Sequence, residues 1–250
     1  MNKYINEINA IKELIVKCGE IILAADRDEI DIESKVGSAN FVTDYDKRVQ
    51  DELRDGLLEI MPQAHFIGEE GEKEQFSETG MFFIVDPIDG TTNFIKDYHV
   101  SGISVALVKD GKVDVAFIYN PYLKEMFYAK RGEGAYCNDK RIHVSNQPLE
   151  NGIVIFGTSP YNEELAKKSF DMAYEYFTKA LDIRRSGSAA LDMCYVAAGR
   201  AELFFELLLS PWDYAAGSLI VEEAGGVVST VEGGEISLDK PCSVMARNKK

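Results

Sequence analysis

The segment FIVDPIDGTTNF, residues 83–94, places two aspartates three positions apart at the end of an apolar run. The run MFFIVD reads as a short buried strand, and the proline that follows Asp86 favours an extended backbone there. Pro87 suits the second position of a tight turn, which would bring the Asp86 and Asp89 side chains to one side. Two carboxylates that close repel, so one takes up a proton unless a cation sits between them. The spacing therefore indicates either a site for an oxygen-ligated cation such as Mg²⁺ or an Asx-type turn that an aspartate caps.

The residues after this pair favour a ligand. Gly90 lets the backbone approach a bound group closely, and Thr91 and Thr92 can open a helix. Free N–H groups at the start of a helix attract phosphate oxygens. A divalent cation beside an anion cradle is the arrangement used for the transfer of a phosphoryl group to water.

Two further acidic features stand elsewhere in the chain. The segment HFIGEE ends an apolar run with Glu69 and Glu70, and SPWDYAAG places Asp213 at the entry to a predicted helix. Taken singly, the glutamates fit a solvated turn and Asp213 fits a helix N-cap. Taken with Asp86 and Asp89, they suggest one acidic site assembled from distant parts of the chain.

Composition excludes several classes of function. The 250 residues are 46% hydrophobic, enough for a sizeable core, and carry a formal net charge of −15. An acidic surface repels phosphates, so neither nucleic acid nor a membrane is an expected partner. The three histidines are isolated, which argues against zinc, and the four cysteines form no C-x-x-C pair. With no signal-peptide pattern and no membrane-length apolar run, the expected location is the cytoplasm.

The order of predicted elements indicates a layered α+β fold. A stripe of apolar residues at helical spacing runs from Ile8 to Ile22, residues 34–46 read as a loop, and a second helix is expected from Lys47 to Pro62. Two strand-like runs flank KDGK, residues 109–112, as in a β-hairpin. Beyond about residue 145, strands alternate with helices, so we expect an N-terminal half, 1–145, and a C-terminal half, 146–250, fused in one compact unit.

The motifs GEE, DPIDGTTNF and PWDYAAGSLIVEEAGG resemble those of the inositol monophosphatase family of Mg²⁺-dependent, lithium-sensitive phosphatases. The resemblance extends through FVTDYDKRVQDEL, RGEGAYCN and RRSGSAALDMCYVAAGRAELFFE, and so covers nearly the whole chain. It implies the α-β-α-β-α sandwich of the inositol monophosphatase and sugar phosphatase type. It also implies a homodimer that hydrolyses a small phosphorylated polyol or nucleotide with a water activated by two or three Mg²⁺.

The resemblance also implies roles for individual residues. The metals would be held by five positions, which are Glu69, Asp86, the Ile88 carbonyl, Asp89 and Asp213. Thr91 would orient the attacking water and Asp46 would accept its proton, although Asp46 also fits an N-cap of the helix after it. Glu69 is counted with these catalytic residues, and Glu70 and Lys35 are expected next to the ligands.

The substrate contacts follow from the same resemblance. They are Asp89, Gly90, Thr91, Ser188, Ala189 and Glu206. An ionised carboxylate such as Glu206 only accepts hydrogen bonds and so suits a polyol, while its alternative is a charge at a strand end. IDGTTNF resembles the inositol branch, but the apolar run Leu207–Leu209 departs from the more polar stretch of many inositol phosphatases. NADP 2′-phosphate, fructose 1,6-bisphosphate and 3′-phosphonucleotides stay open as substrates, as does a non-catalytic regulatory binding protein.

Overall fold

The structure is a computed structural model that describes residues 5–26, 29–34, 41–71, 75–160 and 162–250. Within these ranges the helices are α1 (Ile5–Leu23), α2 (Asp44–Ile60), α3 (Thr91–Ile95), α4 (Glu163–Phe177), α5 (Ala189–Ala197) and α6 (Pro211–Glu223), and a 3-10 turn lies at Leu149–Asn151. Among the residues described, no helix is both long enough and apolar enough to cross a membrane.

Three sheets carry the strands of the described residues. A two-stranded ribbon pairs β1 (Ile32–Ser34) with β2 (Phe41–Thr43). The first large sheet has the order of the chain and contains β3 (His65–Gly68), β4 (Met81–Asp89), β5 (Gly102–Lys109), β6 (Lys112–Asn120), β7 (Glu125–Lys130), β8 (Gly134–Cys137) and β9 (Lys140–Ile142). The second has the order β11-β10-β12-β14-β13 and contains β10 (Ile153–Phe156), β11 (Asp182–Arg184), β12 (Leu203–Leu209), β13 (Val227–Ser229) and β14 (Cys242–Arg247).

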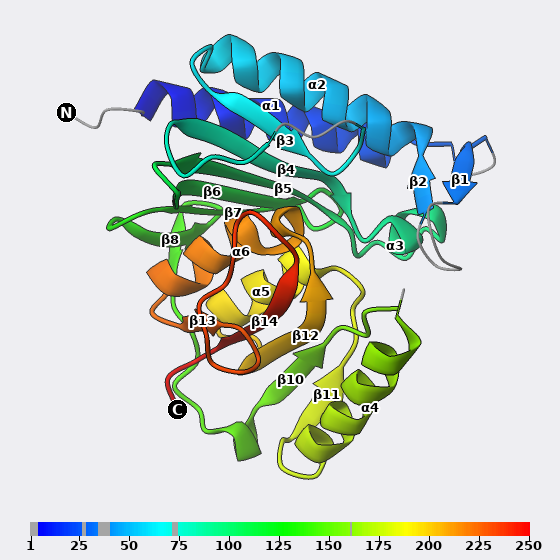
Figure 1. Ribbon diagram of the computed structural model, residues 1–250, viewed down its shortest axis with the longest axis vertical. Coiled ribbons are helices and arrows are strands. Elements are labelled where there is room, and N and C mark those ends of the chain that lie inside the picture. Colours follow the sequence, from blue (N-terminus) through cyan, green and yellow to red (C-terminus); the bar gives the residue numbers. More distant parts are fainter. Residues whose placement is uncertain (1–4, 27–28, 35–40, 72–74, 161) are drawn as a thin grey trace.

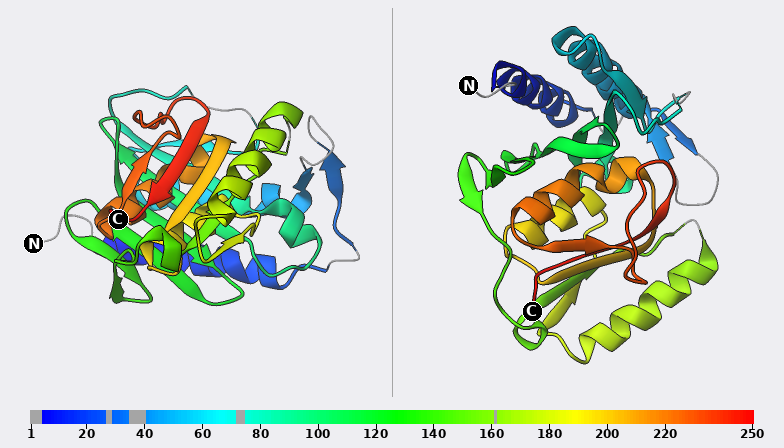
Figure 2. Two further views of the ribbon diagram at one scale, coloured as in Figure 1. Left: turned by 90° about the horizontal axis from the view of Figure 1, so that it is seen from below. Right: turned by 60° about the vertical axis from the view of Figure 1, so that its left-hand side comes forward.

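The elements stack in five layers, which confirms the predicted α-β-α-β-α sandwich (Figure 1). Helices α1 and α2 cover one face of the first sheet, α5 and α6 lie between the two sheets, and α4 covers the outer face of the second sheet (Figure 2). The predicted stripe from Ile8 to Ile22 is buried in the outer layer, against the first sheet. The predicted hairpin is present as β5 and β6.

Both faces of β4 are buried, which explains its continuous apolar sequence. Phe83 and Val85 pack in the core beneath α1 and α2, whereas Phe82 and Ile84 pack in the core that contains α5 and α6. Because side chains alternate along a strand, Asp86 follows Phe82 and Ile84 on the side of α5 and α6. The strand thus delivers its aspartate to the middle of the sandwich.

Two local predictions need correction. The segment after Asp86 is a bulge within β4, because the pairing with β5 shifts register between Asp86 and Asp89; it is not a tight turn between elements. The second helix begins at Asp44 instead of Lys47, since Thr43 caps it: the Thr43 hydroxyl accepts the Asp46 N–H, and the Thr43 N–H is bonded to Asp46 Oδ2 at 2.7 Å. The expected loop 34–46 therefore contains β2 and the first turn of α2.

Candidate functional site

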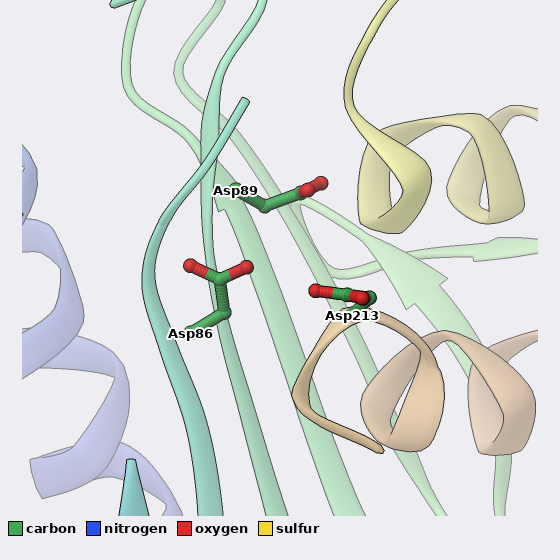
Figure 3. Close-up of side chains that lie close together, drawn as sticks. All are labelled: Asp86, Asp89 and Asp213. Carbon is green, nitrogen blue, oxygen red and sulfur yellow. The ribbon is translucent and has the colours of Figure 1, made fainter. Parts of the chain in front are cut away.

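Three aspartates from two elements converge at the end of β4. Asp86 and Asp89 come from the bulge of β4 and Asp213 from the first turn of α6, and an oxygen of each lies within 4.8 Å of the others (Figure 3). The side chains of Asp86 and Asp89 are buried and that of Asp213 is partly buried. Buried carboxylates this close repel one another strongly, so the group fits a hard divalent cation with oxygen ligands.

The electrostatics of the group agree with that fit. Burial raises the pKa of Asp86 well above its usual range, and the charges of Glu69, Asp89 and Asp213 raise it further. The pKa of Asp213 is raised in the same way by burial and by Glu69 and Asp89. Raised pKa values favour protonation of these side chains when no cation is bound, and a cation would compete with those protons.

Asp89 is held by the start of α5, which is about a hundred residues away in the sequence. Its Oδ2 accepts hydrogen bonds from the Ser188 hydroxyl and from the Ala190 N–H at 2.8 Å. Ser188 is also the N-cap of α5, where its side chain accepts the Leu191 N–H. Two donors on Oδ2 fix the orientation of the Asp89 carboxylate, which takes part in the three-aspartate group.

Replacing Ser188 with alanine is expected to lower the free energy of unfolding by about 1–2 kcal/mol, because one N-cap and one bond to Asp89 are lost together. Denaturant unfolding measures the change. Ser169→Ala is the matched control: the Ser169 hydroxyl is buried and has no hydrogen-bond partner in the described part of the chain, so its removal should be neutral or stabilising. Equal losses for the two variants would contradict this reading of Ser188.

Asp213 and Asp46 occupy equivalent positions in their helices. Each is the third residue of its helix and completes a capping box, with Ser210 as the N-cap of α6 and Thr43 as the N-cap of α2. The Ser210 N–H donates to Asp213 Oδ2 at 2.7 Å. Neither aspartate is the N-cap residue itself, so the N-cap alternative is wrong for both; each bonds to the N-cap residue from the third helical position. This bond uses Oδ2 of each aspartate and leaves Oδ1 for other contacts.

The Thr91 and Asp46 side chains lie in contact. The Thr91 hydroxyl lies 3.4 Å from Asp46 Oδ1 and 3.3 Å from the Ile88 carbonyl oxygen. Asp46 is fully buried, and this burial raises its pKa to about 7. A carboxyl with that pKa can both take up and release a proton near neutral pH.

Glu69 and Glu70 follow β3 in a partly exposed segment that lines the same cavity. The Glu69 N–H donates to the Val85 carbonyl at 3.1 Å, which places Glu69 beside the end of β4. Its charge raises the pKa of Asp86, Asp89 and Asp213. Lys35 lies outside the described residues.

The expected substrate residues line a cavity of about 590 Å³ that also contains the aspartates. Gly90, Ser188, Ala189 and Glu206 all belong to its wall. Gly90 has φ +91°, and a Cβ there would lie 3.0 Å from the Val100 carbonyl oxygen, so the position requires glycine. Glu206 is buried in β12 and accepts the Ser159 N–H at 2.8 Å, and burial raises its pKa to about 7.

Other lining residues were not among the predictions. Arg185 is the single basic side chain in the described wall, and Ser159 and Trp212 also contribute. Asp192 is buried, and its Oδ1 has no hydrogen-bond partner among the described residues. Asp192 lies one helical turn after Ser188, so the sequence spacing alone could have placed it on the same face of α5 as Ser188. No such local pattern indicates Ser159, because its loop reaches the cavity through long-range packing.

Comparison with known proteins gives a consistent picture. The model of the inositol monophosphatase family matches residues 5–250. Nus factor SuhB of Escherichia coli K12 is 40% identical over 202 residues, which are 80% of this chain and 76% of that protein. An inositol-1-monophosphatase of Rhizobium meliloti is 36% identical over 230 residues, 91% of this chain and 86% of that protein.

Solved structures share the whole architecture. The extragenic suppressor protein SuhB of Bartonella henselae superimposes with a TM-score of 0.90 at 34% identity, covering 98% of this chain and 94% of that chain. Inositol monophosphatase-II of Staphylococcus aureus has been solved with inositol monophosphate bound, with a TM-score of 0.82 at 27% identity over 98% of this chain and 90% of that chain. The same protein with 2′AMP bound gives a TM-score of 0.81 at 28% identity, over 95% and 88% of the two chains.

Proposed function

Because the chain belongs to the inositol monophosphatase family, we propose that it is a Mg²⁺-dependent phosphomonoesterase that hydrolyses inositol 1-phosphate or a related polyol phosphate. One observation supports this more than any other. Asp86, Asp89 and Asp213 converge in the cavity that Thr91 also lines, and Thr91 contacts a buried acid, Asp46. A cation site and a proton acceptor beside one cavity are what the hydrolysis of a phosphate ester requires.

Both predicted halves of the chain contribute to the proposed metal site. Glu69, Asp86, the Ile88 carbonyl and Asp89 from the half 1–145, with Asp213 from 146–250, would hold two or three Mg²⁺. When bound, these ions supply positive charge that stabilises the phosphoryl oxygens and lowers the pKa of water. The buried carboxylates fit that role, since their repulsion leaves the metal-free site deficient in positive charge.

The chain's own residues would then handle the proton. The Thr91 hydroxyl can donate to Asp46 Oδ1 while its oxygen accepts a hydrogen bond from the attacking water. As the new O–P bond forms and the ester P–O bond breaks, the proton of the water passes to Asp46 through the threonine hydroxyl. The departing alkoxide takes a proton from a solvent water molecule in the cavity and leaves as an alcohol. The hydroxide formed in this way is neutralised when Asp46 releases the proton that it accepted.

Ser188, Ala189 and Glu206 form the wall where the alcohol portion would bind. One Glu206 oxygen is occupied by the Ser159 N–H, so its other oxygen is the acceptor offered to a substrate hydroxyl. The apolar run after it borders the cavity through Leu208 and Leu209. This border, and the 2′AMP bound in the staphylococcal structure, favour nucleotide phosphates such as NADP 2′-phosphate as a second substrate class.

The activity is tested by phosphate release with and without Mg²⁺, comparing kcat/KM for inositol 1-phosphate, NADP, fructose 1,6-bisphosphate and a 3′-phosphonucleotide. Release that depends on Mg²⁺, stops with EDTA and is inhibited by lithium is the expected result. The relatives named Nus factor favour a second candidate, a regulatory binding role. A complete absence of phosphate release from every substrate would leave that role as the better proposal.

We also propose that two copies form a homodimer in the cytoplasm. Exposed apolar side chains lie on α4 and just beyond it at helical spacing: Phe170, Tyr174, Phe177 and Leu181. Patches of this kind on a folded protein are typical of interaction surfaces. Size-exclusion chromatography with light scattering distinguishes a dimer from the monomer mass of 27.9 kDa.

A further inference from the structure

We propose that Gln50 is a positioning residue that fixes Glu69 and Glu70 for cation binding, an inference that rests on the proposed Mg²⁺-dependent function. Gln50 lies on α2 and is 7% exposed. Its Nε2 donates to the Glu70 carbonyl at 2.8 Å, and its Oε1 accepts the Glu70 N–H at 2.9 Å. One side-chain amide thus satisfies both backbone groups of the same residue, as a neighbouring strand would.

The segment is built to receive this amide. A Cβ at Gly68 would lie 2.1 Å from Gln50 Oε1, so the glycine leaves the space that the Gln50 side chain occupies. On the other side, the Glu69 N–H is bonded to Val85 of β4, one residue before Asp86. The two glutamates therefore stand between α2 and the strand that carries Asp86 and Asp89, and backbone hydrogen bonds fix them from both directions.

The same face of α2 also carries Asp46. Asp46 and Gln50 are four residues apart on the helix, so their side chains project side by side, and both are buried. One rigid helix thus sets the position of the proton acceptor and of the Glu69 segment. Such shared support keeps a site in register while a cation and a substrate exchange.

A glutamate at this position can make both bonds only as the protonated acid. An ionised glutamate only accepts hydrogen bonds, so in Gln50→Glu one oxygen would face the Glu70 carbonyl without a proton between them. Gln50→Leu has a similar size and removes both bonds. The two variants therefore separate loss of the donor from loss of the whole contact.

The experiment measures cation affinity directly, by calorimetric titration of the metal-free protein with Mn²⁺ and Mg²⁺ in the absence of substrate. We expect the Gln50 variants to bind these ions about tenfold to a hundredfold more weakly, as is usual when the support of a metal ligand is removed. The Mg²⁺ concentration for half-maximal phosphate release should rise in parallel, while kcat recovers at saturating Mg²⁺. Gln63→Leu is the matched control, because Gln63 is exposed and its Nε2 donates to the Met81 sulfur at 3.9 Å. The cation affinity of this variant should stay unchanged.

Gly68→Ala tests the same contact from the other side. It should weaken cation binding as Gln50→Leu does, and the double variant should be no weaker than either single variant, since both break one contact. Unchanged cation affinity in a folded Gln50→Leu protein overturns the proposal. So does a loss of kcat that saturating Mg²⁺ does not restore. If the wild type binds the cation but releases no phosphate, the proposed function fails while the titration still decides the role of Gln50.

Discussion

Replacing Asp89 with asparagine is expected to lower kcat/KM for a phosphate ester by about a thousandfold and to leave the fold intact. Loss of one ligand from a metal centre removes several kcal/mol of stabilisation of the transition state, and each 1.36 kcal/mol is a factor of about ten. Asp86 and Asp213 cannot replace the lost ligand, because each already contributes its own oxygen to the three-aspartate group from another backbone position.

The hydrogen bonds around Asp89 explain why the amide is so disruptive. Oδ2 of Asp89 accepts from the Ser188 hydroxyl and the Ala190 N–H, so an asparagine must turn its single oxygen toward these donors. Its NH₂ group then replaces Oδ1, the oxygen that Ser188 and Ala190 leave for a cation shared with Asp86 and Asp213. There it donates hydrogen bonds to their carboxylates and occupies the place of the cation.

Two measurements made together check this account. Steady-state kinetics give the loss of activity, and thermal unfolding without Mg²⁺ should show a variant at least as stable as the wild type, because a buried carboxylate and its repulsion are gone. Asp171→Asn on the exposed face of α4 is the control for the chemical change and should leave both quantities unaltered. Wild-type turnover by Asp89→Asn at saturating Mg²⁺ would remove Asp89 from the proposed site.

The sequence predicted those elements whose signals are local. The stripe from Ile8 to Ile22 and the D-G turn at residues 110–111 each require only neighbouring residues, and both match the structure. The proximity of Asp86 and Asp89 also followed from their spacing, although the backbone achieves it with a bulge. A bulge depends on how β5 pairs with β4, and strand pairing is not encoded at one position.

The remainder of the site is set by long-range packing. Nothing in the segment DKRVQDEL indicates that Gln50 reaches the backbone of Glu70, or that Ser188 will hold Asp89 from the far half of the chain. The resemblance to the inositol monophosphatase family implied that Ser188 and Glu206 contact the substrate. The structure adds that Ser188 donates to Asp89 and that Glu206 supports the loop of Ser159.

The metal-free protein is expected to lose stability as the pH rises from about 4 to about 7, which is the reverse of the usual trend for carboxylates. Burial raises the pKa of Asp46 from 3.8 to about 7 and that of Glu206 from 4.5 to about 7, and it raises the pKa of Asp86 and Asp213 as well. In this window the folded protein binds more protons than the unfolded chain, so its free energy of unfolding falls as protons are withdrawn.

Mg²⁺ should oppose that loss, because the cation binds the ionised carboxylates of the folded state only. At a hundred times the dissociation constant, a ligand adds about 2.7 kcal/mol, or roughly 5–10 °C in Tm for a chain of this size. Melting curves with EDTA and with Mg²⁺ should therefore differ little near pH 5 and diverge toward pH 8.

Surface repulsion from the net charge of −15 also lowers stability in EDTA as the pH rises. Added salt screens this surface repulsion, whereas it screens the buried group far less. If the divergence disappears in Asp86→Asn and survives added salt, the effect is located in the three-aspartate group. If the protein in EDTA is more stable at pH 7 than at pH 5, the acids are not buried together.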